Sequence, residues 1–216
     1  MQYIIMCGGN YKHLLLPKAL FKVNGETLIS RTIRLLRENG IDDIAISTNS
    51  RDFNDLGVMI LRHRNRYWTD KQENNYGYWV DAFYPAEYPV CYLFGDVYYS
   101  PEAIKTIIET ETDDIEFFAS APPFADNYPK EWAEPFALKV VNNKHLSDAV
   151  AETKQLQDDG LFARRPIMWE LWQVIKKTRI NVIDYTNYTV INDYTCDIDY
   201  ERDLKFYEHS GGQNVL

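Results

Sequence analysis

The sequence predicts an α/β fold built on a mainly parallel sheet. In residues 1–48, an apolar run, a glycine turn, an amphipathic helix and a second apolar run follow in order. Such β-loop-α-β units build parallel sheets. Residues 89–94 (PVCYLF) are almost entirely apolar, which is typical of a central parallel strand buried on both faces. The length of 216 residues suits one α/β domain, with a soft boundary near residue 120 between two halves.

The elements of the first half follow from apolar runs and turn residues. We expect strands over residues 3–6, 41–48, 57–61, 89–94 and 115–119. Asn24-Gly25 is a strong turn signal. Apolar residues recur at helical spacing over residues 27–39, and Gly40 follows as a stop. Residues 62–70 read as a polar loop, residues 72–83 as a helix, and residues 101–109 as a helix with proline in its first turn.

The second half is predicted in the same way. Residues 122–130 hold three prolines and read as a loop. Strands are expected over residues 135–141, 181–185 and 188–192, and helices over residues 146–155, 166–176 and 201–208. No internal repeat or low-complexity linker interrupts the chain.

Composition excludes several classes of function. The formal net charge is −9, and no long stripe of basic residues exists to neutralise nucleic-acid phosphates. The three cysteines are widely spaced within apolar runs, so they form neither a disulfide framework nor a zinc motif, and we expect them in the core. The sequence shows no signal peptide and no membrane-length span. We therefore expect a soluble cytoplasmic protein with no nucleic-acid or membrane partner, and we leave its oligomeric state open.

The first strand runs into a candidate phosphate loop. Gly8-Gly9 allows the backbone to approach a ligand closely, and Lys18 supplies a positive charge a few residues later. A tight turn with a surface lysine is the structural alternative.

Aspartates follow two other predicted strands. Asp96 comes directly after the central strand, and Asp197 and Asp199 follow a short strand near the end of the chain. Ligands of open α/β sheets bind at the carboxyl ends of the strands, and Mg²⁺ prefers carboxylates together with substrate phosphates. A simple turn at Asp96 and helix capping by Asp199 are the alternatives. Taken together, the glycine loop, the lysine and the aspartates predict a site for Mg²⁺ and a triphosphate.

The order of these motifs resembles the sugar-phosphate nucleotidyltransferase superfamily, the GT-A-like pyrophosphorylases. The matching text is MCGG at residues 6–9, PKAL at 17–20, VNGETLI at 23–29 and GIDDI at 40–44. FGDV at 94–97 resembles the family's G-D metal motif, and DIDYERDL at 197–204 resembles its D-I-D-T-P-E-D-L motif. The resemblance is strong over residues 1–48 and faint between residues 110 and 190. It implies a three-layer αβα Rossmann-like nucleotidyltransferase fold, with a nucleotide-binding half (1–120) and an acceptor-binding half (121–216).

The resemblance also implies residue roles. Lys18 matches the lysine that contacts the nucleotide phosphates, and Asp96 and Asp199 match the Mg²⁺ carboxylates, with Asp197 as a neighbour that could substitute. Residues expected to bind the nucleotide are Gly8, Gly9, Asn10, Lys12, His13, Lys18, Asn74 and Gly77. For Asn74 and Gly77, a polar helix start is the alternative.

One departure concerns the family's loop arginine, which clamps the triphosphate. Its position falls on His13 or Lys12 here, and neither side chain offers the bidentate fork of arginine. The basic patch of Arg62, Arg64 and Arg66 is the candidate replacement.

The implied reaction moves a nucleoside monophosphate from an NTP to a sugar phosphate or related phosphorylated metabolite and releases pyrophosphate. Its expected role is the synthesis of surface or capsular polysaccharide precursors. For the acceptor we single out Glu134, Lys139, Arg164 and Arg165, with a basic turn as the alternative for the arginine pair. Trp169 and Trp172 are expected in the core. A GT-A glycosyltransferase and a catalytically weak nucleotide-binding or regulatory module remain the competing functions.

Overall fold

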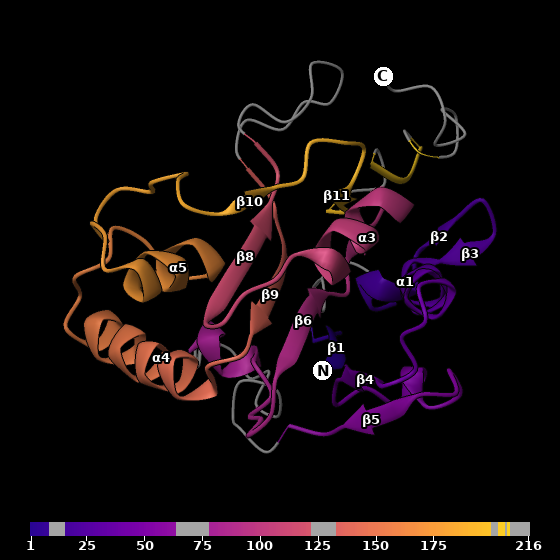
Figure 1. Ribbon diagram of the computed structural model, residues 1–216, viewed down its shortest axis with the longest axis horizontal. Helices are drawn as coiled ribbons and strands as arrows, with labels where there is room; N and C mark the ends of the chain where they lie inside the picture. The colour runs from indigo at the N-terminus through magenta and orange to yellow at the C-terminus, as the bar shows by residue number, and fades with distance from the viewer. Residues whose placement is uncertain (9–15, 64–77, 122–132, 200–202, 206, 208–216) are drawn as a thin grey trace.

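The computed structural model describes residues 1–8, 16–63, 78–121, 133–199, 203–205 and 207. Its centre is a seven-stranded sheet in the order β10-β8-β9-β6-β1-β4-β5 (Figure 1). In chain order, the strands are β1 (Gln2–Met6), β4 (Ile44–Ser47), β5 (Met59–Leu61), β6 (Val90–Phe94), β8 (Ile115–Ala119), β9 (Pro135–Val140) and β10 (Thr189–Val190).

The sheet is mainly parallel, as the sequence predicted. Strand β1 pairs in parallel with β4 and β6, β4 pairs in parallel with β5, and β10 pairs in parallel with β8. Strand β9 is antiparallel to both of its neighbours, β6 and β8. Among the seven strands, β9 therefore runs against the other six, and its first residues lie where the other strands end.

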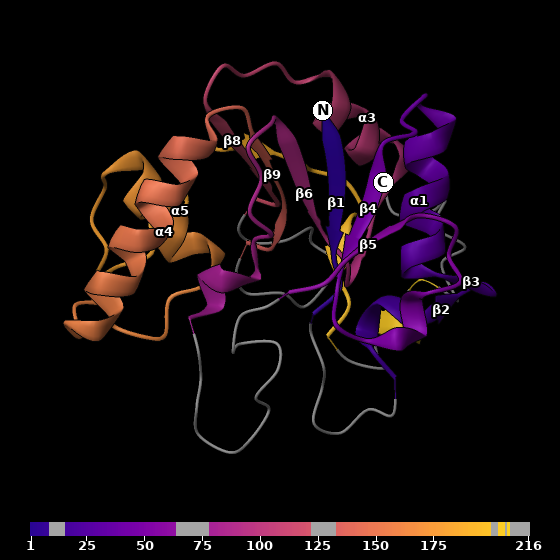
Figure 2. The same cartoon turned by 90° about the horizontal axis from the view of Figure 1, so that it is seen from below.

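Helices cover both faces of the sheet and complete three layers. Helices α1 (Leu28–Glu38) and α3 (Pro101–Glu109) lie on one face, and α4 (Asn143–Asp158) and α5 (Met168–Lys176) lie on the other (Figure 2). The three-layer αβα Rossmann-like architecture is confirmed.

Side-chain caps fix where these helices begin. The hydroxyl of Thr27 accepts the Ser30 N–H at 3.1 Å, and the hydroxyl of Ser100 accepts the Ala103 N–H at 2.8 Å. Each bond pairs a backbone N–H that has no acceptor within the first turn of the helix. At α5, Glu170 reaches back and accepts the Ile167 N–H at 3.0 Å.

Short elements connect the larger ones. Strands β2 (Lys22–Val23) and β3 (Glu26–Thr27) form a hairpin across Asn24-Gly25, whose φ values of 51° and 86° are those of a two-residue hairpin turn. The predicted turn is confirmed. Near the carboxyl edge of the sheet, β7 (Val97–Tyr98) pairs antiparallel with β11 (Cys196–Asp197).

Two predicted elements differ in the structure. Residues 181–185 form no strand, because Tyr185 packs edge-on against Trp169 at 4.8 Å and Gln173 Nε2 donates to the Val182 carbonyl at 2.6 Å, so the segment covers α5. The described part of the predicted helix 72–83 is a 3-10 turn, η3 (Trp79–Ala82). The loop 122–130, most of the loop 62–70 and most of the helix 201–208 lie outside the described residues.

The core contains the residues expected there. Cys7, Cys91 and Cys196 are buried and free of disulfides, and Trp169 and Trp172 are buried in α5. In the described part of the chain, we find no helix whose length and apolar character would let it cross a membrane.

Candidate active site at the carboxyl edge of the sheet

The candidate site lies where the order of the strands reverses. The chain proceeds from β1 outward to β4 and β5, then returns to place β6 on the other side of β1. Ligands of open α/β sheets bind outside the carboxyl ends of the strands at such a switch point. Gly8 follows β1 and Asp96 follows β6, so both predicted residues flank this point.

The two strand ends are drawn together at Gly95. The Gly95 N–H donates to the Met6 carbonyl at 3.0 Å. A Cβ on Gly95 would lie 2.6 Å from Cys7 Sγ and 2.7 Å from the Met6 carbonyl oxygen. Only glycine leaves room for this approach, which holds Asp96 beside the end of β1. Burial and the nearby Asp96 carboxylate raise the pKa of the Cys7 thiol, so Cys7 stays protonated.

Lys18 lies at the centre of the site. It begins the 3-10 turn η1 (Lys18–Leu20) directly after Pro17, and only 8% of its side chain is exposed. Its Nζ lies 3.1 Å from Asp96 Oδ2 and 2.5 Å from Asp199 Oδ1. One ion-pair group therefore joins three segments that are far apart in the sequence.

Strand β11 carries Asp199 to this position. The Ile198 N–H donates to the Asp96 carbonyl at 2.8 Å, which continues the pairing of β11 with β7. The Asp199 N–H donates to Asp203 Oδ2 at 2.8 Å, so Asp203 holds the backbone of Asp199. The carboxylate of Asp199 is thus engaged with Lys18.

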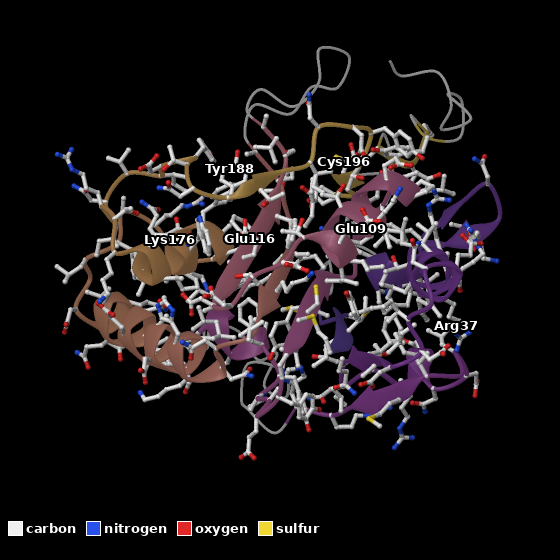
Figure 3. The ribbon with its side chains drawn as sticks, viewed as in Figure 1. Arg37, Glu109, Glu116, Lys176, Tyr188 and Cys196 are labelled. Carbon is white, nitrogen blue, oxygen red and sulfur yellow. The ribbon has the colours of Figure 1, made fainter. Side chains whose placement is uncertain are left out.

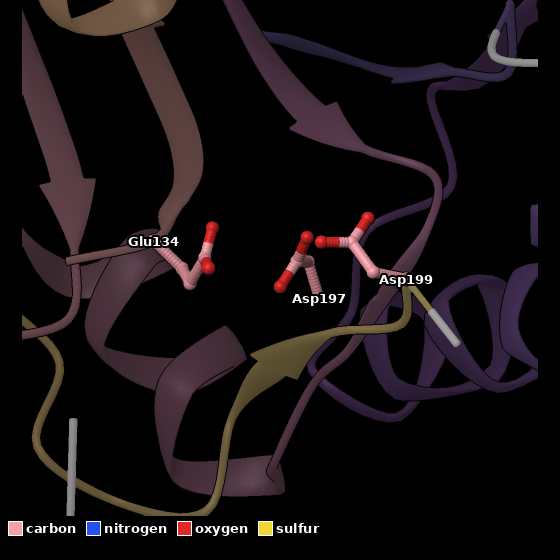
Figure 4. A group of neighbouring side chains, drawn as sticks. All are labelled: Glu134, Asp197 and Asp199. Carbon is pink, nitrogen blue, oxygen red and sulfur yellow. The ribbon is translucent and has the colours of Figure 1, made fainter. Parts of the chain in front are cut away.

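A third carboxylate joins Asp197 of β11 and Asp199, which follows this strand. Ligand oxygens of Glu134, Asp197 and Asp199 lie within 4.8 Å of one another, and Figure 4 shows these carboxylates close together at the site. Glu134 is buried directly before β9, where its N–H donates to the Ser120 hydroxyl at 2.8 Å. Because β9 is antiparallel to its neighbours, the residue before its start lies at the carboxyl edge of the other strands.

The donor set fits a divalent cation of the Mg²⁺ kind. Carboxylate oxygens are the hard ligands that Mg²⁺ prefers. The Lys18 ammonium lies between the carboxylates of Asp96 and Asp199, so these two groups already bind a positive charge. The same lysine, Asp96 and Gly95 line a cavity of about 30 Å³ with Cys7 and Pro17, which offers room for one water molecule.

The predicted acceptor residues lie beside α5. Arg164 Nε is 2.5 Å from Glu170 Oε1, and the Glu170 side chain is buried. The pKa of Tyr185 is raised, mainly by burial; Arg164 lowers it, and Glu134 and Glu170 raise it. Tyr185 therefore lies near these three charged side chains. Arg165 is exposed.

The segment that leads to β11 crosses the carboxyl edge of the sheet. Figure 3 shows Tyr188 and Cys196 on this segment, above the end of β8. The Tyr188 hydroxyl donates to the Ser120 carbonyl at 3.0 Å. Tyr188 also packs edge-on against Trp169 at 5.2 Å, so one aromatic cluster joins α5, β8 and this segment.

One prediction from the sequence is corrected. Lys139 lies at the opposite edge of the sheet, where its Nζ donates to the carbonyls of Ile108 at 3.0 Å and Thr110 at 2.6 Å. The direction of β9 explains this, because the five residue steps from Glu134 to Lys139 span about 17 Å of strand.

Arg62 is the described member of the basic patch. It donates to the carbonyls of Thr48 and Ser50 in the loop after β4. Its role as a replacement for the loop arginine stays a prediction.

Several predicted nucleotide residues lie outside the described residues. These are Gly9, Asn10, Lys12, His13, Asn74 and Gly77, together with Arg64 and Arg66 of the basic patch. Of the loop glycines, Gly8 is described and lies directly after β1.

Comparisons with known proteins point to one superfamily. Residues 3–77 match the family model of the MobA-like NTP transferase domain. The whole chain, aligned with 96% of a putative glucose-1-phosphate thymidylyltransferase from Bacillus anthracis, has 15% identity and a TM-score of 0.62. It also aligns in full with 97% of the inositol-1-phosphate CTP transferase from T. maritima, at 16% identity and a TM-score of 0.58.

A third solved structure has the same fold. Here 96% of the chain aligns with 97% of the CTP:phosphocholine cytidylyltransferase from Streptococcus pneumoniae, at 18% identity and a TM-score of 0.51. No curated protein matches the sequence significantly. These findings confirm the resemblance to the sugar-phosphate nucleotidyltransferase superfamily and the fold that it implied.

Proposed function

We propose that this chain, which has the fold of the nucleotidyltransferase superfamily, transfers a nucleoside monophosphate from an NTP to a phosphorylated small molecule and releases pyrophosphate. The observation that carries the proposal is the Lys18 ammonium between Asp96 and Asp199 at the switch point of the sheet. Three separated motifs converge there, and each supplies a residue that phosphate chemistry needs.

The reaction is a single displacement at the α-phosphorus. An anionic oxygen of the acceptor phosphate forms a bond to the α-phosphorus, and the bond between the α-phosphorus and the bridging oxygen of the pyrophosphate breaks. Pyrophosphate leaves with the electron pair. A phosphate monoester is already an anion near neutral pH, so its attacking oxygen needs no general base. Lys18 binds the phosphates and stabilises the charge that develops on them.

Mg²⁺ is the cation that we propose for the carboxylates. Asp96 and Asp199 would hold it, with Asp197 beside them, and it would neutralise the charge of the triphosphate. The buried Asp203 keeps the Asp199 backbone fixed, so the aspartate is held in position before any ligand binds.

The acceptor is proposed to bind between the carboxylates and α5. Glu134 offers a buried acceptor for a hydroxyl group, and both Glu134 and Arg164 lie near Tyr185. Arginine has five donors, so Arg164 can keep Glu170 and still contact a phosphate. The three similar proteins act on glucose 1-phosphate, inositol 1-phosphate and phosphocholine, according to their names. A sugar phosphate or a related phosphorylated alcohol is therefore the acceptor class that we propose.

A role in precursors of surface or capsular polysaccharide is part of this proposal and rests on the superfamily resemblance. A cytoplasmic location stays a prediction.

The test is pyrophosphate release in the presence of Mg²⁺, with each of the four NTPs and a panel of sugar and polyol phosphates. We expect release with one pair of substrates, and a loss of about 100-fold or more in both Lys18→Ala and Asp96→Ala. Lys22→Ala, an exposed lysine of β2, is the matched control and is expected to keep the activity. Transfer from a sugar nucleotide without pyrophosphate release would instead indicate a glycosyltransferase.

A further inference from the structure

We propose that Lys18 competes with the divalent cation for the same carboxylates. Its ammonium occupies the cation site between Asp96 and Asp199 until the phosphates of a triphosphate bind the ammonium instead. Metal and nucleotide would then bind cooperatively, and the protein without nucleotide would bind a divalent cation weakly. This inference rests on the proposed function and adds an order to its binding steps.

The competition follows from the atoms involved. The ammonium contacts Asp199 Oδ1 at 2.5 Å and Asp96 Oδ2 at 3.1 Å. A Mg²⁺ ion would use oxygens of the same two carboxylates at about 2.0–2.1 Å. An ammonium and a divalent cation repel each other, so both cannot hold these carboxylates at full strength.

Burial makes the competition strong. Only 8% of the Lys18 side chain is exposed, and the two aspartate side chains are 31% and 23% exposed. Ion pairs shielded from water in this way are screened by salt much less than surface pairs. The turn η1 fixes the backbone of Lys18, since the Phe21 N–H donates to the Lys18 carbonyl at 2.9 Å. The ammonium can therefore leave the two aspartates only by a movement of the Lys18 side chain.

A triphosphate provides the means of displacement. Its oxygens are anionic acceptors that can take the ammonium, which then leaves the aspartates to the metal. Each ligand would thus raise the affinity of the protein for the other by the same factor.

The experiment measures Mn²⁺ binding by titration calorimetry without any nucleotide. We expect Lys18→Met to bind Mn²⁺ at least about tenfold more tightly than the wild type, because the competing charge has gone. Lys22→Met changes the net charge by the same amount, but Lys22 is exposed on β2. This variant is therefore expected to bind Mn²⁺ with the affinity of the wild type. The double variant Lys18→Met/Asp96→Asn is expected to lose the gain, which places the ion at Asp96.

Circular dichroism checks that each variant is folded, and Lys18→Gln serves as a second neutral variant. An unchanged Mn²⁺ affinity in folded Lys18→Met and Lys18→Gln would overturn the inference. A gain that survives Asp96→Asn would also overturn it, because the ion would then bind elsewhere. The Mn²⁺ titration needs no turnover. If Lys18→Met gains Mn²⁺ affinity but the wild type releases no pyrophosphate, the proposed function is refuted, whereas the competition between Lys18 and the ion is still supported.

Discussion

At the scale of single residues, Gly95 sets the position of Asp96, the carboxylate that we propose for the cation. Gly95→Ala would force its Cβ against Cys7 Sγ and the Met6 carbonyl oxygen, which lie 2.6 Å and 2.7 Å from that position. We expect a loss of about 1–3 kcal/mol in the free energy of unfolding. We also expect reduced pyrophosphate release, because Asp96 moves away from Lys18. Urea unfolding and the pyrophosphate assay measure the two effects.

A second substitution separates the two contacts. Cys7→Ala removes the sulfur but leaves the Met6 carbonyl, so the double variant Cys7→Ala/Gly95→Ala should recover only part of the lost stability. Full recovery would show that the sulfur alone makes Gly95 necessary.

His63 makes stability depend on pH. Burial lowers the pKa of His63 to about 4, although Asp81 raises it, and the ring contacts the buried Ser47 hydroxyl. The folded protein keeps the ring neutral, whereas the unfolded chain binds a proton below about pH 6.5. Stability is therefore lost as the pH falls from about 6.5 toward 4, by about 2–3 kcal/mol from this group.

His63→Gln tests this assignment. The variant lacks the titrating group, so its free energy of unfolding should fall less steeply than that of the wild type between pH 6.5 and 4. Equal slopes in urea unfolding at several pH values would show that other groups cause the loss.

Among the site residues, those next to strand ends could be predicted from the sequence. Gly8, Lys18, Asp96 and Asp199 stand in ordered motifs, and the described ones meet at one edge of the sheet. Glu134 could be named, but its place beside the two aspartates could not, since that depends on the direction of β9.

At the scale of elements, β9 marks the limit of sequence reasoning. Apolar residues predict a strand there, but its direction depends on which neighbours it pairs with, and β6 and β8 are far from it in the sequence. The strand predicted over residues 181–185 failed for a related reason. Tyr185 of this segment packs on Trp169 of α5 instead of standing in a strand, and tertiary packing of this kind overrides local propensity.

Lys139 links two elements in a way that the sequence did not reveal. It reaches from β9 to the carbonyls of Ile108 and Thr110 at the end of α3 and so stabilises the helix C-terminus. Lys139→Met should lower the free energy of unfolding by about 1–3 kcal/mol, because two partly buried carbonyls lose their donor. Lys105→Met, on the exposed side of α3, should change it by less than about 0.5 kcal/mol.

The same variant separates stability from activity. Lys139 lies at the edge opposite the candidate site, so kcat and KM should stay unchanged at temperatures where the variant is folded. A large loss of kcat in folded Lys139→Met would contradict the proposed location of the active site.

At the scale of the whole molecule, the sheet joins the two predicted halves. Strands β6 and β8 precede residue 120, and β9 from the second half lies between them. The proposed nucleotide side and the proposed acceptor side of the site are therefore built on one sheet. The α/β class with a mainly parallel sheet followed from apolar periodicity and the β-loop-α-β unit, which are local signals, and the three layers followed from the resemblance. The meeting of Glu134, Asp197 and Lys18 depends on long-range pairing and needed the structure.

The most direct test of the central claim is a ³¹P NMR analysis of the reaction mixture with the productive NTP and acceptor. We predict two coupled phosphorus signals from a new pyrophosphate diester, together with one free pyrophosphate for each molecule of product. Both are expected to be absent with Asp96→Ala and Lys18→Ala. Release of inorganic phosphate in place of pyrophosphate, or a product that lacks the α-phosphorus of the NTP, would contradict nucleotidyl transfer at this site.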